Sequence, residues 1–133
     1  MKLSSIEGIG ASYARKLEKA GIRSTNALLE RAATAKGRKE LAAETGISDT
    51  LILEWVNHAD LFRITGIGGE YADLLEEAGV DTVAELAKRV PEKLYQKMVE
   101  VNQAKNLVNK LPGLSQVEDW IAQAKKLPRV VTY

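Results

Sequence analysis

Apolar residues recur at helical spacing along most of this 133-residue chain, and the strict alternation that marks a β-strand is almost absent. Between Ala11 and Ala20, for example, Tyr13, Ala14 and Leu17 fall on one face of a helix. The same spacing predicts further helices at approximately residues 24–33, 36–45, 49–59, 82–90, 91–101, 102–111 and 115–127. The pattern therefore predicts an all-α protein of about eight helices.

Residues that favour helix ends support these boundaries. Gly21 and Gly46 follow two of the predicted helices, at positions where glycine commonly adopts the left-handed conformation that ends a helix. Hydroxyl side chains can accept the free N–H groups at a helix N-terminus, and they precede four predicted helices at Ser24, Ser48, Thr82 and Ser115. Pro91 suits the first turn of another helix, because its missing N–H has no partner to lose there.

The sequence also contains an internal repeat at an offset of 58 residues. Residues 6–14 recur as residues 64–72, and about thirty positions match in kind without a gap. A self-match of this length is typical of duplicated structural units. We therefore predict two units of about four or five short helices each, covering residues 1–62 and 63–133 and packed together around one core.

Composition narrows the class of protein. Without cysteine, the chain has no disulfide and no thiolate metal site. No apolar run approaches the roughly 20 residues that span a bilayer, and the first residues lack the apolar region of a secretory signal. We expect no membrane association and a cytoplasmic location. His58 is the single histidine, and no phosphate-binding loop, dinucleotide motif or nucleophile elbow is present, so we predict that the protein is not an enzyme.

Charge is distributed unevenly, although the net charge is only +1. Residues 1–39 hold nine basic and three acidic side chains, whereas residues 40–92 hold three basic and twelve acidic ones. Residues 93–133 are basic again, with seven basic and three acidic side chains. Such segregation can give a nearly neutral molecule one basic face that attracts a polyanion.

The repeated segment contains a glycine-rich turn that leads into a helix. Gly8 and Gly10 are expected to let the backbone turn sharply and to let another molecule approach it closely, while Ile9 anchors the turn in the core. The first N–H groups of the helix that follows have no partner within the helix. A phosphate oxygen can accept them and is favoured there by the helix dipole.

This pattern resembles the helix-hairpin-helix motif, and it is filled first by Ile6, Gly8, Ile9, Gly10, Ala14 and Leu17 and again by Ile64, Gly66, Ile67, Gly68, Ala72 and Leu75. Residues 80–86 are similar to the segment after the hairpin in the C-terminal domain of the RNA polymerase α subunit. The whole chain resembles a bacterial domain family of unknown function built from two such units. The resemblance implies a SAM-like fold, sequence-independent DNA backbone binding, no cofactor, and in some relatives a monovalent cation at a hairpin.

Charge distinguishes the two turns. Arg15, Lys16 and Lys19 follow the first turn, and Ser12 offers a hydroxyl group close to its second glycine. Acidic residues occupy the matching places after the second turn, beginning with Glu70. Since carboxylates repel phosphate, we predict that the first turn binds nucleic acid through Gly8, Ile9, Gly10, Ser12, Arg15, Lys16 and Lys19. The second turn is predicted to be structural or to meet a partner, through Gly66, Ile67, Gly68 and Glu70.

A second interpretation belongs to another class of function. The acidic block at residues 40–92 also suits a protein-interaction scaffold that meets a basic partner, including the basic ends of another copy. The first interpretation predicts weak, salt-sensitive DNA binding by a monomer. The second predicts salt-sensitive homo-oligomers and no DNA binding.

Overall fold

The computed structural model describes residues 1–133 and contains eight α-helices, one short 3-10 helix and no strand, which confirms the predicted all-α class. None of these helices has the combination of length and apolar character needed to cross a bilayer. The chain forms two compact units. The first comprises Met1–Asp60 together with Val130–Tyr133, and the second comprises Leu61–Arg129.

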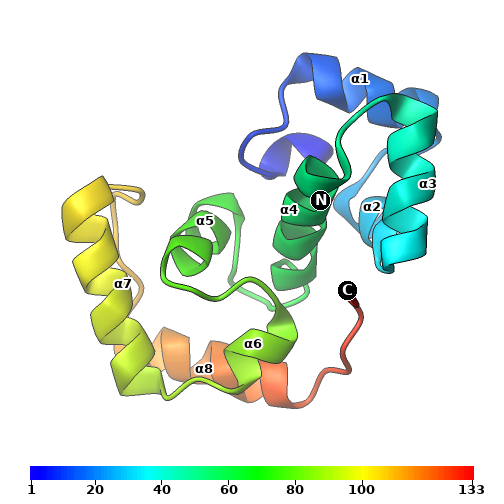
Figure 1. Cartoon of the computed structure of the whole chain (residues 1–133). Helices are drawn as coiled ribbons and strands as arrows, with labels where there is room; N and C mark the ends of the chain where they lie inside the picture. The colour runs from blue at the N-terminus through cyan, green and yellow to red at the C-terminus, as the bar shows by residue number, and fades with distance from the viewer. The chain divides into compact units, whose positions relative to one another are not determined.

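The first unit contains the 3-10 helix η1 (Leu3–Ser5), α1 (Ala11–Lys19), α2 (Thr25–Ala32), α3 (Ala35–Thr45) and all but the last residue of α4 (Asp49–Leu61), as Figure 1 shows. Three of its helices begin at a hydroxyl cap. Ser24 Oγ accepts the Ala27 N–H at 3.1 Å, and Ser48 Oγ accepts the Leu51 N–H at 3.2 Å, as predicted. Thr34 caps α3 in the same way.

The core of the first unit lies beneath η1, the turn and α1. Leu3, Ile6 and Leu17 are almost fully buried there. Trp55 from α4 is 1% exposed, and its ring makes an edge contact with Tyr13, with ring centroids 5.1 Å apart. The buried Trp55 ring therefore packs against both the first turn and α1.

Arg38 on α3 explains why the last four residues belong to this unit. The side chain is 5% exposed and donates to the carbonyl oxygens of Ala32, Ala33 and Thr132, at 3.1, 2.9 and 2.6 Å. The Thr132 N–H donates in return to the Ala33 carbonyl at 2.9 Å. The sequence repeat assigned this tail to the second unit, residues 63–133, because a self-match gives no information about such a backbone contact.

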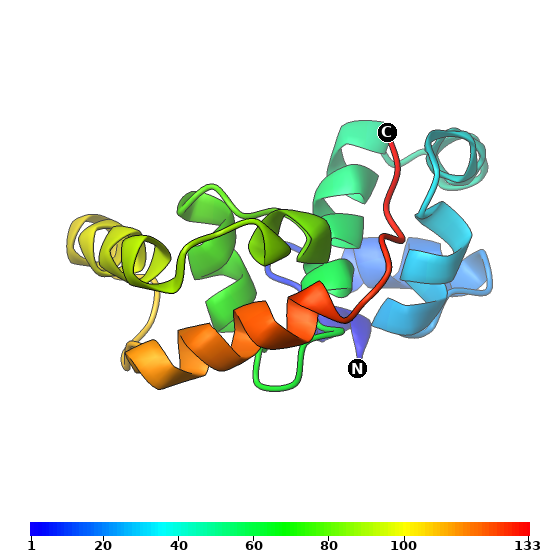
Figure 2. The same cartoon turned by 90° about the horizontal axis from the view of Figure 1, so that it is seen from below.

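The second unit contains α5 (Gly69–Glu77), α6 (Val83–Ala87), α7 (Pro91–Lys105) and α8 (Leu114–Lys125). Within it, α8 packs against α6 and α7, and α5 packs against α7 (Figure 2). Trp120 on α8 is 2% exposed within a continuous apolar cluster, and Tyr71 packs against its ring at 5.3 Å between centroids. The aromatic pair of the first unit thus recurs in the second.

Several predicted helix ends in this unit are wrong, and the helix predicted at residues 102–111 is absent; α6, for example, ends at Ala87 rather than near residue 90. α7 does not stop near residue 101 but runs to Lys105, and no helix covers residues 106–111. Asn106 ends α7 in the left-handed conformation with φ +51°, and the Asn102 side chain bonds both the N–H and the carbonyl of Val108. α8 begins at Leu114 rather than after a Ser115 cap, because Gln116 Oε1 accepts the Gly113 N–H at 2.8 Å.

Candidate nucleic-acid interface

The backbone of the first turn requires glycine at one position, Gly8. Gly8 has φ +92°, a backbone conformation that residues other than glycine rarely adopt. The Ile6 N–H donates to the Leu3 carbonyl and the Ile9 N–H to the Ile6 carbonyl, at 3.1 and 3.3 Å. Ile6 and Ile9 are both buried, so the turn is anchored in the core as expected.

Gly10 does not have the special backbone conformation that we expected of both glycines in this turn. Its φ is −88°, an ordinary extended conformation, and a Cβ atom built there would meet no atom within 4 Å. The turn therefore does not require glycine at this position. Gly10 is the N-cap residue of α1, and because it has no side chain, the N-terminus of this helix stays open to an approaching molecule.

The first backbone N–H groups of α1 have no acceptor within the protein. The Ala14 N–H is the first in this helix to bond, to the Gly10 carbonyl at 3.0 Å, and no side chain caps the helix. This leaves the amides of Ala11, Ser12 and Tyr13 as free donors. The residues at the helix start are exposed, apart from the half-buried Tyr13. The amides expected to receive an anion are therefore not used by a cap.

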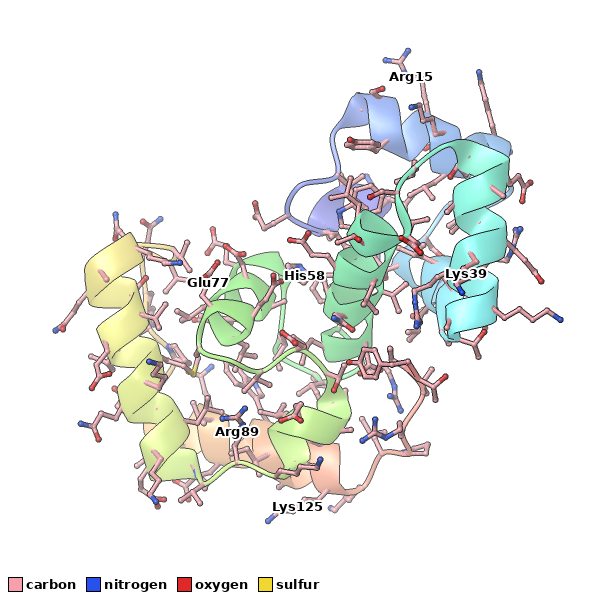
Figure 3. All side chains as sticks on the ribbon, in the orientation of Figure 1. Arg15, Lys39, His58, Glu77, Arg89 and Lys125 are labelled. Carbon is pink, nitrogen blue, oxygen red and sulfur yellow. The ribbon has the colours of Figure 1, made fainter.

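Three basic side chains of α1 line a hollow together with Ser12, which is also one of the residues with a free amide. Ser12, Arg15, Lys16 and Lys19 line this hollow of about 240 Å³, and all four are exposed. None of the three cations lies within 4.0 Å of an acidic group, since no ion pair includes them. Arg15 points away from the body of the first unit (Figure 3). Four of the seven predicted binding residues thus share one face of α1, which we term the α1 basic face.

The second turn repeats the backbone but not the charge. Gly66 has φ +100°, Ile67 is 2% exposed, and Gly68 is the N-cap of α5 without a side-chain cap. Glu70 stands exposed in the first turn of α5, where its carboxylate compensates the positive end of the helix dipole. An anion bound there would meet this carboxylate, so the two turns are chemically unequal.

A family model described as a domain of unknown function (DUF4332) matches residues 7–127. The chain belongs to this family. Both turns and the α1 basic face lie within the DUF4332 match, so they are parts of the domain itself rather than additions at its ends. Comparison with curated proteins and with solved structures gives no match.

The DUF4332 domain contains a second basic hollow that sequence reasoning missed. Lys88, Arg89, Lys93 and Lys97 belong to its lining, in the second unit. Dividing the sequence into blocks of charge separated Lys88 and Arg89 from Lys93 and Lys97, because the boundary fell between residues 92 and 93. The signal was available as four basic side chains within residues 88–97.

Proposed function

We propose that this DUF4332 domain is a non-catalytic helix-hairpin-helix module that binds the phosphate backbone of nucleic acid at the start of α1. The observation that carries the proposal is the coincidence of free amides at Ala11, Ser12 and Tyr13 with the α1 basic face. Either feature alone is common on protein surfaces. Together they offer one phosphate both directed hydrogen bonds and positive charge.

The chemistry of the donors predicts the kind of binding. Backbone amides and long basic side chains engage phosphate oxygens, and such contacts position a protein without reading base sequence. With about three cations on the α1 basic face, few counterions are released there, so this face should bind weakly by itself and contribute only a shallow salt dependence. Glu70 disfavours the same contact at the second turn, so of the two turns we assign binding only to the first.

Gly10→Ser tests the role of the amides directly. The backbone at Gly10, with φ −88° and ψ 178°, is in the extended region that N-cap serines adopt. The new hydroxyl should accept the Tyr13 N–H, as Ser24 accepts the Ala27 N–H. The variant should therefore be as stable as the parent or more stable by about a few tenths of a kcal/mol. It should nevertheless bind a mixed-sequence duplex about tenfold more weakly, because an amide bond to a charged group is lost.

Gly68→Ser is the matched control, since Gly68 has nearly the same backbone conformation and also lacks a side-chain cap. It should stabilise the second unit similarly and leave the DNA affinity unchanged. Fluorescence anisotropy at low salt measures the affinity, and urea unfolding measures the stability. Equal DNA affinity for both variants and the parent would refute the proposal. Absence of DNA binding together with salt-sensitive oligomers in light scattering would favour the protein-interaction scaffold instead.

A further inference from the structure

The second basic hollow has a defined place in the second unit. It has a volume of about 240 Å³ and lies where the C-terminal end of α5 meets the first turns of α7. Figure 3 labels Arg89, which belongs to the connection between α6 and α7. The complete lining is Ala78, Lys88, Arg89, Val90, Lys93, Leu94 and Lys97. The hollow is at the opposite end of α5 from the second turn, so Glu70 is not part of it.

Its four cations are only partly neutralised. Arg89 donates to the Gly79 carbonyl at 2.8 Å and contacts Glu85 at 3.4 Å, and the Lys88 ammonium lies 3.9 Å from the same carboxylate. Lys93 and Lys97 are exposed and take part in no ion pair. They are four residues apart on α7, which places them on one face and about 6 Å apart along its axis.

Apolar side chains form part of the lining between these cations. Leu94 and Ala78 are 3% and 5% exposed, whereas Val90 is 49% exposed beside them. Apolar surface next to a charge reduces the screening by water and strengthens the attraction for an anion. The unit that carries the acidic turn therefore also contains a region that attracts negative charge.

We infer that this hollow is a second contact for the nucleic-acid backbone, located in the second unit and independent of its turn; the ligand class rests on the function proposed above. Sites for small molecules are generally enclosed, with a few precisely placed polar groups. Here the lysines are exposed on long, flexible side chains, and each would make only a weak contact with a phosphate group. That arrangement suits a long polyanion, because every neutralised phosphate releases counterions along the strand.

The test is the salt dependence of duplex affinity for Lys93→Gln/Lys97→Gln. If both lysines neutralise a phosphate, the slope of log affinity against log salt concentration should fall in magnitude by about 2 relative to the parent. Lys125→Gln/Lys126→Gln is the matched control, since it removes the same charge from exposed positions of the same unit that do not line the hollow. The control slope should stay close to that of the parent protein.

An Arg15→Gln/Lys16→Gln variant distinguishes the failure of this inference from failure of the proposed function. If the change on α1 weakens binding while Lys93→Gln/Lys97→Gln behaves like its control, the inference is wrong and the proposed function stands. If only the α7 variant weakens binding, the α1 site is wrong and the hollow stands. Micromolar binding of inorganic pyrophosphate in calorimetry, abolished by Lys93→Gln/Lys97→Gln, would overturn the inference in favour of a small-ligand site.

Discussion

Replacing Gly66 with alanine should destabilise the second unit through two separable effects. The first is backbone strain, because Gly66 has φ +100° and a residue with a Cβ atom costs about 1–2 kcal/mol in a left-handed conformation. The second is crowding, because the new Cβ would lie 3.0 Å from Trp120 Nε1. Trp120 is 2% exposed and packed against Tyr71, so its ring has little room to move.

Gly66 itself is exposed, but crowding the buried Trp120 ring is a form of overpacking, which costs about 1–3 kcal/mol and brings the expected loss for Gly66→Ala to about 2–5 kcal/mol. Gly79→Ala is the matched control in the same unit. Its φ is +95°, but the nearest atom to a new Cβ is the end of the Arg89 side chain at 3.8 Å. Gly79→Ala should therefore show backbone strain alone, about 1–2 kcal/mol. Gly8→Ala should behave like this control, since Trp55 Nε1 lies 3.8 Å away.

Urea unfolding followed by circular dichroism and tryptophan fluorescence measures these losses. The change in unfolded-state entropy from glycine to alanine is shared by the variants, so it cancels in their difference. The excess loss of Gly66→Ala over Gly79→Ala then reports the contact with Trp120. Equal losses for the two variants would refute the steric argument, and no loss for either would refute the assigned role of the left-handed backbone.

Two further predictions concern the helix connections. Arg38→Leu should cost about 2–4 kcal/mol in urea unfolding, since it removes the guanidinium donor from the carbonyls of Ala32 and Thr132 and leaves the Ala33 carbonyl only the Thr132 N–H. Lys39→Leu on the same helix is exposed and should change stability by less than about 0.5 kcal/mol, and similar losses for both would contradict this role. Asn106 has φ +51°, so Asn106→Gly should be neutral or stabilising, whereas Asn106→Val should be destabilising. A thermal unfolding midpoint that is unchanged in both variants would contradict this prediction.

The sequence was sufficient for features that depend on local pattern. Helical spacing and the repeat predicted the all-α class and most helices, and the cap roles of Ser24 and Ser48 followed from residue chemistry. A predicted left-handed residue at Gly21 is also confirmed, with φ +87°. These features are set within a few residues of one another, so a local reading of the sequence contains what determines them.

Features that depend on specific side-chain partners were not predictable in this way. Asn106 ends α7 in a conformation that glycine usually adopts, so the sequence contained no glycine to mark this end, and Gln116 supplies the capping interaction assigned to Ser115. At the candidate site, the pattern identified both glycines of the first turn but not that only Gly8 is required by the backbone. The hollow near Arg89 was missed because the charge blocks divided its four cations, placing Lys88 and Arg89 in the acidic block 40–92 and Lys93 and Lys97 in the next one.

The contact between Arg38 and Thr132 has a consequence for dividing the protein into fragments. A piece cut at the repeat boundary would leave a nearly buried guanidinium group with only two of its three carbonyl acceptors. A fragment of residues 1–62, which is one complete copy of the repeat, therefore lacks a contact that the first unit uses. We expect it to unfold at a lower temperature by itself than within the intact chain. The repeat in the sequence and the compact units of the structure therefore have different boundaries in this protein.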